Sequence, residues 1–277
     1  MEIVAGVVAT LAPGLRRLTA PNPGMMTGPG TNTYIVGTDA LVVIDPGPDL
    51  PEHIAALTEL AGPHLAWILC THTHRDHSPA ARELQRRTGA KVGGRPAPDD
   101  ARHDESFAPE RILADGDTIS VPGVTLRAVH TPGHASNHLC FLWEERRLLF
   151  TGDHVMQGST VVISPPDGDM AVYLASLERL LDFDIAHLAP GHGRIIEEPH
   201  GEVKRLVAHR LKRERKVLAA VEDSGGGTLA ELVKRAYDDA SEKLHEVAQR
   251  SLHAHLIKLR DEGRVKVENG RWVLTKA

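Results

Sequence analysis

Four potential metal ligands lie within the segment THTHRDHS (71–78), directly after an apolar run. They are His72, His74, Asp76 and His77. Imidazole and carboxylate groups are ligands that zinc, iron and manganese accept as divalent cations. Polar side chains at this density would desolvate one another unless a cation were bound between them. The segment therefore predicts a metal site.

Three further potential ligands stand in short glycine-containing loops, each after a run of β-forming residues. They are His134 in HTPGH (130–134), Asp153 in TGDH (151–154) and His192 in PGHG (190–193). Glycine allows the backbone to come close to a crowded site. Because strand-end loops on one edge of a sheet can bring such side chains together, we expect all seven ligands to meet there.

The order of these motifs resembles the metallo-β-lactamase superfamily. THTHRDH is similar to its HxHxDH signature, and TPGH, TGD and PGHG are similar to its later motifs. VVIDPG (42–47), which carries Asp45 at the end of a strand, is similar to its first motif. The resemblance covers residues 1–200 and implies an α/β fold, the αββα sandwich, with a two-metal site at one edge.

The resemblance also implies the role of each ligand. One metal would be held by His72, His74 and His134, the second by Asp76, His77 and His192, and Asp153 would bridge both. Two divalent metal ions are expected, zinc (Zn2+) first, with iron and manganese as alternatives. A bridging water or hydroxide would be the nucleophile, because two cations strongly lower its pKa. Asp76 and Asp45 are the expected catalytic carboxylates, Asp45 by orienting a ligand or its loop.

Other residues near the motifs leave two interpretations open. His138 and His154 could contact substrate or act as a general acid, or they could be structural. Cys70 and Cys140 lie in apolar runs, where cysteine is usually a small buried hydrophobe. Six histidines without a motif are expected at the surface: His53, His64, His103, His187, His200 and His209.

The first part of the chain alternates short strands and helices, which is typical of layered α/β proteins. Helices are expected over 51–62, over 78–89 with Ser78 as N-cap and Gly89 at the end, and over 170–182. Strands are expected within 1–14, 33–37, 40–45, 66–72, 118–130, 138–153 and 185–193.

The character of the chain changes near residue 200. Residues 1–201 carry 15 Lys and Arg against 25 Asp and Glu, a net charge of −10, and residues 202–277 carry 17 against 12, a net of +5. The two values sum to the total of −5. In the tail we expect three helices, over 201–224, 227–239 and 245–263. A hairpin over 264–276 should follow, with its turn at Asn269-Gly270. We therefore expect two domains, 1–200 and 201–277, of which the second is a winged helix.

A narrower resemblance joins both parts. NPGMMTGPGTNTYIVG (22–37) is similar to the opening loop of the β-lactamase-like protein 2 group, whose members also end in a winged helix. That group includes a ribonuclease acting on single-stranded RNA. One departure is Asn137, where an acidic residue would be expected, and it bears on the substrate and not on the metal site.

The sequence thus predicts a metal-dependent hydrolase, with a phosphodiester in single-stranded RNA or DNA as the leading substrate. The alternatives are a thioester of the acyl-glutathione kind, or a lactam or lactone. A nucleic-acid-binding regulator with a ligand-sensing metal domain is the alternative outside enzymes. Aromatic residues make up 4%, which leaves few platforms for base stacking. The N-terminus lacks the basic region of a signal peptide, so we expect a cytoplasmic protein without membrane contact.

Overall fold

The computed structural model describes residues 3–275. The chain divides into two compact units, each described here by itself. The first unit comprises 1–131, 137–159 and 183–199; the second comprises 132–136, 160–182 and 200–277. The predicted boundary between 200 and 201 stays a prediction.

A seven-stranded sheet in the first unit carries the first motifs. Its strands, in spatial as in chain order, are β1 (Val8–Ala12), β2 (Leu15–Thr19), β3 (Asn32–Val36), β4 (Leu41–Ile44), β5 (Leu65–Leu69), β6 (Lys91–Gly94) and β7 (Arg111–Ile112). The pairs from β1 to β4 are antiparallel, and those from β4 to β7 are parallel. The sequence did not predict β2, β6 or β7; in β6, KVGG has Val92 as its one branched residue and ends in two glycines, which are rare in strands.

A five-stranded sheet in the same unit carries the later motifs. Its spatial order is β12 (His187–Pro190), β11 (Leu148–Gly152), β10 (Leu139–Trp143), β9 (Val124–His130) and β8 (Thr118–Val121). Only β11 and β12 pair in parallel. Asp153 and His192 therefore leave neighbouring parallel strands at the same edge of the sheet. Short 3-10 turns follow helices and strands at η1 (Gly62–His64) and η2 (Glu144–Arg146).

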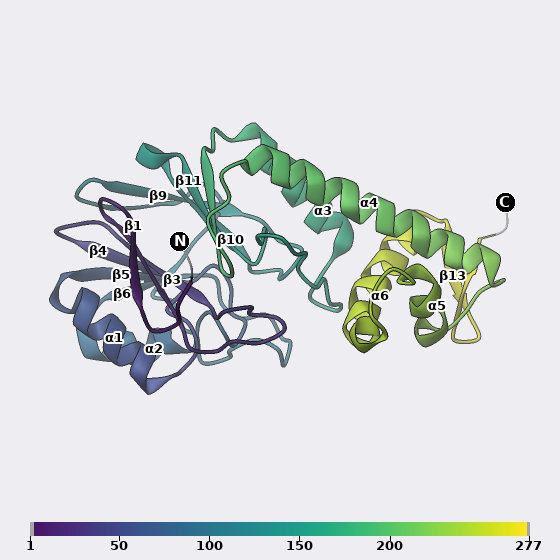
Figure 1. Cartoon of the computed structure of the whole chain (residues 1–277), viewed down its shortest axis with the longest axis horizontal. Helices are drawn as coiled ribbons and strands as arrows, with labels where there is room; N and C mark the ends of the chain where they lie inside the picture. The colour runs from purple at the N-terminus through teal and green to yellow at the C-terminus, as the bar shows by residue number, and fades with distance from the viewer. Residues whose placement is uncertain (1–2, 276–277) are drawn as a thin grey trace. The chain divides into compact units, whose positions relative to one another are not determined.

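Two apolar cores hold the first unit together. One lies between the sheets, where Tyr34 and Ile44 of the first sheet and Phe141 and Phe150 of the second belong to one buried cluster. The other lies between the first sheet and its helices, α1 (Pro51–Ala61) and α2 (Ala80–Thr88), which cover its outer face (Figure 1). Burial of this apolar surface fixes where the strands end, and so where the motif loops begin.

The start of α2 differs from the prediction. The helix begins at Ala80, Pro79 occupies the N-cap position, and no side chain caps the helix. Ser78 donates its hydroxyl to Asp104 at 2.9 Å instead. The other end agrees with the prediction, since Gly89 ends the helix in the left-handed conformation, with φ 73°.

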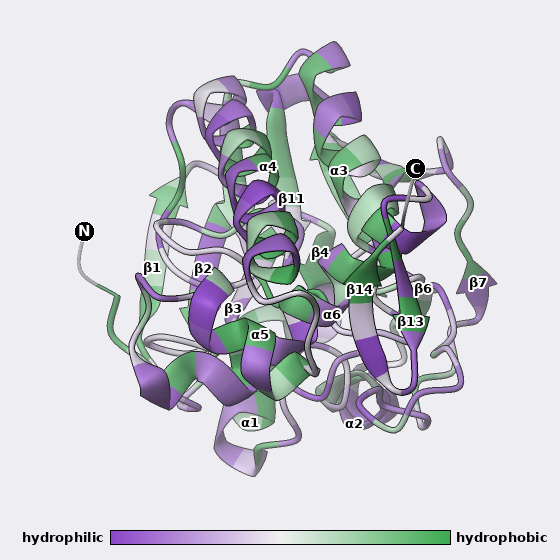
Figure 2. Ribbon diagram, turned by 90° about the vertical axis from the view of Figure 1, so that its right-hand side faces the viewer, coloured by the Kyte–Doolittle hydropathy of each residue, from purple (hydrophilic) through white to green (hydrophobic). Residues whose placement is uncertain are grey.

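The second unit is mostly helical. Its helices are α3 (Met170–Arg179), α4 (Pro199–Asp223), α5 (Leu229–Ala236) and α6 (His245–Asp261), with 3-10 turns η3 (Leu180–Asp182) and η4 (Glu242–Leu244). The hairpin consists of β13 (Val265–Glu268) and β14 (Arg271–Leu274). Asn269 and Gly270 between them both have positive φ, as the sequence predicted. Figure 2 shows hydrophilic and hydrophobic residues mixed along α4, as in a helix with one buried face.

A single apolar cluster joins α4, α5, α6 and the hairpin. It includes Val221, Leu232, Leu256 and Trp272. Three helices and a hairpin around one core confirm the predicted winged helix. Residues 1, 2, 276 and 277, including the ends of the predicted first strand and hairpin, lie outside the described residues. Within residues 3–275, no helix is long and apolar enough to cross a membrane.

Candidate metal centre

Asp45 anchors the loop 71–78 at the end of β5. Its carboxylate accepts hydrogen bonds from the Thr71 backbone N–H at 2.7 Å and from the Thr71 hydroxyl at 2.8 Å. Asp45 is buried and has a positive φ of 51°, an unusual conformation for a residue other than glycine. The packing around β4 and β5 must offset that strain. Asp45 therefore fixes the point from which the motif loop departs.

The same carboxylate orients His77. Oδ2 of Asp45 lies 3.0 Å from Nδ1 of His77, so the ring Nε2 faces away from Asp45. That Nε2 is 3.5 Å from Oδ2 of Asp76 and 3.4 Å from Oδ1 of Asp153. A histidine held at one nitrogen by a carboxylate presents the other nitrogen as a metal donor.

His192 is oriented in a similar way by a backbone group. Its Nδ1 lies 3.2 Å from the carbonyl oxygen of Gly30. Its Nε2 lies 3.2 Å from Oδ2 of Asp76 and 3.3 Å from Oδ1 of Asp153. Asp76 and Asp153 thus meet the inward nitrogens of both His77 and His192.

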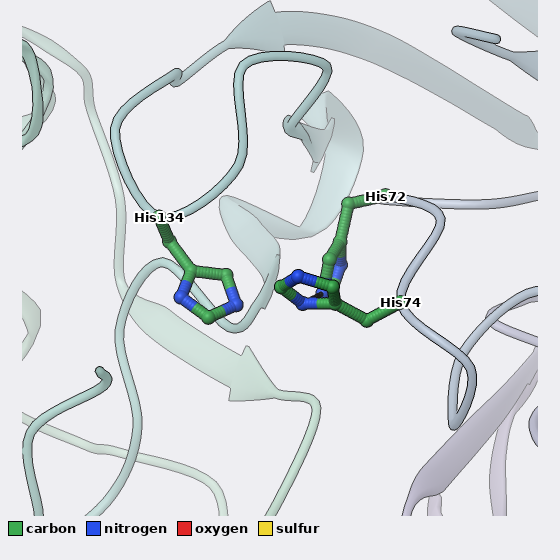
Figure 3. A group of neighbouring side chains, drawn as sticks. All are labelled: His72, His74 and His134. Carbon is green, nitrogen blue, oxygen red and sulfur yellow. Dashed lines mark hydrogen bonds between the residues drawn. The ribbon is translucent and has the colours of Figure 1, made fainter. Parts of the chain in front are cut away.

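His72 and His74 form the other end of the cluster. Nε2 of His72 and Nδ1 of His74 are 3.0 Å apart, and Nδ1 of His72 lies 3.0 Å from the Thr71 hydroxyl. His134 lies in 132–136, which groups with the second unit, and its Nδ1 is 2.8 Å from the carbonyl oxygen of Val162. Figure 3 draws His134 together with His72 and His74.

Two glycines make room for the cluster. A Cβ on Gly152 would lie 2.4 Å from the Thr71 hydroxyl oxygen. A Cβ on Gly191 would lie 2.7 Å from Cε1 of His77 and 3.0 Å from Oδ1 of Asp153. The glycines of TGDH and PGHG are therefore needed for the close approach of backbone to ligands.

The charges of the site call for a cation. Burial raises the pKa of the Asp76 carboxyl, but His77 and His192 outweigh this effect and lower the pKa to about 2. Burial lowers the pKa of the His77 imidazole, but Asp76, Asp153 and Asp45 raise it well above its ordinary value. A cation between these groups would supply the positive charge that protons supply in its absence.

The donor set fits divalent metals of the zinc, iron and manganese kind. Within the first unit, His72, His77 and Asp153 form one set, and Asp76, His77 and His192 form another. In each set the ligand atoms all lie within 4.8 Å of one another. Mixed imidazole and carboxylate donors suit these metals, and Asp153, whose carboxylate has two oxygens, stands between His72 of one set and His77 of both.

The structure corrects several expectations for residues outside the ligand set. His138 and His154 are both 0% exposed, which favours the structural interpretation that the sequence left open for them. His53 and His103 are also buried; the first contacts the Thr33 hydroxyl at 3.0 Å, and the second contacts that of Thr73 at 2.7 Å. Cys70 and Cys140 are buried, as predicted.

Two supporting residues escaped the sequence-based prediction. Thr71 links Asp45 to the ring of His72, and its only signal is its place directly before the first motif histidine. Asn137, the departure from the β-lactamase-like protein 2 pattern, donates to Thr73 at 2.7 Å and to the carbonyl of Pro96 at 3.0 Å. Its amide therefore braces the motif loop.

Comparison with known families agrees with this geometry. Residues 26–192 match the family model described as "Metallo-beta-lactamase superfamily", and residues 228–272 match the "Beta-lactamase associated winged helix domain". "Beta-lactamase-like protein 2 homolog" of Drosophila melanogaster is 32% identical, over 94% of this chain and 92% of its own. "Atrochrysone carboxyl ACP thioesterase dmxR1" of Cryptosporiopsis sp. is 31% identical, over 94% of this chain and 84% of its own.

Solved structures share the fold over nearly the whole chain. A metallo-beta-lactamase family protein from Thermus thermophilus has a TM-score of 0.81 and 24% identity, and the match covers 96% of this chain and 100% of that protein. A beta-lactamase domain protein from Burkholderia ambifaria has a TM-score of 0.84 and 20% identity, over 99% and 95% of the two chains. The expected fold class, an α/β sandwich followed by a winged helix, is confirmed.

Proposed function

Because the chain belongs to the metallo-β-lactamase superfamily and ends in its associated winged helix domain, we propose that this metal-dependent hydrolase holds two divalent cations and cleaves an acyl thioester. His72, His74 and His134 would hold one cation, Asp76, His77 and His192 would hold the other, and Asp153 would be a ligand shared by the two sets. The convergence of Asp76, His77, Asp153 and His192 supports this assignment. When bound, the two cations lower the pKa of a water molecule and polarise the carbonyl under attack.

The protein's own residues orient the reacting groups. Asp76 is ionised, with 28% of its side chain exposed, and is placed to accept a hydrogen bond from the attacking water. Asp45 lies behind His77 and reaches no substrate, so its role is to hold the Nε2 of His77 toward the site. The sequence grouped Asp45 and Asp76 as catalytic carboxylates. We assign Asp76 a catalytic role and Asp45 a positioning role.

The observation that favours a thioester is the complete burial of His138 and His154. These were the general-acid candidates, and neither can protonate a leaving group from inside the core. A thiol has a pKa of about 8.5, so a thiolate can depart without a proton. The atrochrysone carboxyl ACP thioesterase relatives act on a thioester by their names, which agrees with this substrate class.

A single-stranded nucleic acid is the second candidate, and it rests on α4. Lys204, Lys212 and Arg215 are exposed on this helix, and in the described residues no ion pair joins any of them to a carboxylate. Such cations can contact a phosphate backbone. The sequence-based preference for nucleic acid stays a prediction, and a small-molecule lactam or lactone remains a further alternative.

Turnover by the zinc-loaded full-length protein tests the proposal. The substrates are an S-acyl pantetheine, its oxygen-ester analogue and a labelled single-stranded RNA. We expect thiol release from the first with kcat/KM well above that for the ester, and intact RNA. Asp153→Asn should lose at least roughly 100-fold in rate, whereas Asp184→Asn, a change at an exposed surface carboxylate, should not. Cleavage of RNA without thioester turnover would contradict the thioester proposal and support single-stranded nucleic acid as the substrate.

A further inference from the structure

Three consecutive residues in the second unit, 161–163, are each tied to a different element. The carbonyl of Val161 accepts a hydrogen bond from the Arg210 guanidinium on α4. The backbone N–H of Ile163 donates to the Ser251 hydroxyl on α6 at 3.2 Å. Between them, the carbonyl of Val162 accepts from Nδ1 of His134 at 2.8 Å. The tail helices thus hold both neighbours of the carbonyl that orients His134.

These contacts are shielded from water. Arg210 is 3% exposed and Ser251 is 6% exposed, and the side chains of Val161 and Ile163 are buried. A buried backbone group that loses its partner is costly to leave unpaired, so the segment has little freedom to move while both contacts hold. The position of the Val162 carbonyl therefore depends on α4 and α6.

The loop that carries His134 is also held by α3. The Ser176 hydroxyl donates to the carbonyl of Pro132 at 2.8 Å. A Cβ on Gly133 would lie 2.3 Å from Cα of Tyr173, so this loop and α3 are in direct contact. The Arg210 guanidinium lies over the Tyr173 ring, 5.4 Å from its centroid. Arg210 consequently touches both supports of the loop, the segment 161–163 and α3.

We infer that Arg210 and Ser251 are positioning residues for His134, and that the winged helix braces a metal ligand through them. Hydrogen bonding from Nδ1 to the Val162 carbonyl leaves Nε2 of His134 as the donor for a cation. This inference rests on the proposed function, because it takes His134 as a ligand. It assigns the C-terminal helices a part in holding the metal that is independent of any nucleic acid.

The burial of α6 agrees with a bracing role. One side of the helix, with Leu252, Leu256 and Leu259, lies in the winged-helix core. Ser251 and Ala254 are also buried, and Ser251 contacts the segment 161–163. In DNA-binding winged helices, the helix at this place in the fold enters the major groove and needs an open face. Here the strip of α6 that carries Ser251 and Ala254 is buried against the protein's own chain, and Arg250 and Arg260 stay exposed.

Cobalt(II) titration of the full-length metal-free protein, followed by visible absorption, tests the inference. Ser251→Ala and Arg210→Met should each weaken one of two cobalt equivalents by about 10–100-fold, the range found when a group that orients a ligand is removed. The other equivalent should keep the wild-type affinity. Arg205→Met on α4 and Ser224→Ala directly after it are matched controls, because both side chains hydrogen-bond to α4 itself. Both should bind cobalt as wild type does.

A double-mutant cycle with His134→Ala shows whether the two residues act through His134. In that background, Ser251→Ala should cause no further loss of cobalt affinity. Wild-type cobalt affinities for both equivalents in Ser251→Ala and Arg210→Met would overturn this inference and leave the proposed function standing. Losses of affinity that add to the loss caused by His134→Ala would have the same meaning. Absence of cobalt binding by the wild type would overturn the proposed function with it. Ser251→Ala removes a single oxygen atom, so it tests the inference even if Arg210→Met fails to fold.

Discussion

At the residue scale, the site depends on groups that hydrogen-bond the ring nitrogen facing away from the site. This is shown by His77 and His192. Asp45 holds His77, and the carbonyl of Gly30 holds His192. In both rings Nδ1 is engaged and Nε2 is presented to Asp76 and Asp153. The carboxylate of Asp45 contacts Thr71 as well, so one buried group sets both the loop and a ligand.

Asp45→Asn should therefore weaken the metal site without unfolding the protein. The amide keeps the size of the carboxylate but loses the charge that holds the His77 N–H, and we expect a loss of about 10–100-fold in zinc affinity. Competition with a chromophoric chelator measures it. Asp49→Asn is the control, since Asp49 is exposed on the same segment. Unchanged zinc affinity in Asp45→Asn would show that Asp45 holds the loop at Thr71 and does not orient His77 for a metal.

At the element scale, the ends of the strands determine where each ligand lies. β5 leads to His72, β11 to Asp153 and β12 to His192, and the pairing of β11 with β12 brings the last two together. Helix α1 contributes His53, which lies against Thr33 of β3. Burial lowers the pKa of His53 to about 4 from its ordinary 6.5, although the carbonyl of Pro46 opposes this.

The lowered pKa of His53 predicts a loss of stability in acid. Above pH 6.5 His53 is neutral in both the folded and the unfolded state, so its full contribution to the free energy of unfolding is present. As the pH falls from 6.5 to about 4, the unfolded state binds a proton that the folded state refuses. This costs about 3 kcal/mol in the free energy of unfolding.

Urea unfolding between pH 7.5 and 4, with chelator present to remove metal effects, measures this cost. His53→Gln should show a shallower decline than wild type, and His64→Gln, a change at an exposed histidine, should follow the wild type. Parallel declines in all three proteins would mean that His53 is protonated in the folded state at ordinary pH.

Local patterns in the sequence predicted most elements and the candidate ligands that the structure gathers into sets, because strand ends, helix periodicity and the Asn269-Gly270 turn depend on near neighbours. They failed where distant contacts decide. His53 is buried by a contact with Thr33, and His103 by one with Thr73, 20 and 30 residues away in the chain. Ser78 leaves its capping position for Asp104. The contacts of Arg210 and Ser251 with 161–163 likewise have no local signal.

At the scale of the whole molecule, the chain combines a two-sheet metallohydrolase fold with a winged helix in which one strip of α6, with Ser251 and Ala254, is buried. This weakens the alternative of a sequence-specific regulator. Ser251 and Ala254 face the protein's own segments and not solvent. The exposed cations of α4 allow contact with phosphates of any sequence, which is a weak and salt-dependent kind of binding.

We therefore expect duplex DNA to bind without sequence preference, with a Kd no tighter than roughly 10⁻⁶ M at physiological salt. Fluorescence anisotropy with a randomised duplex pool, before and after rounds of selection, measures this. Lys212→Ala should weaken the residual binding, and Arg250→Ala on α6 should not. Selection of one sequence that binds with a nanomolar Kd, together with loss of this binding in Arg250→Ala, would instead support the interpretation of the protein as a sequence-specific regulator.

The measurement that bears most directly on the two-metal site is the metal content of the protein after zinc loading and gel filtration. Wild type should retain two zinc ions per chain, since Asp76, His77, Asp153 and His192 meet at one end of the cluster and His72 and His74 at the other. Asp153→Asn should retain fewer than two while keeping its circular dichroism spectrum. Zinc-free wild type, or two zinc ions in Asp153→Asn, would contradict the dinuclear site.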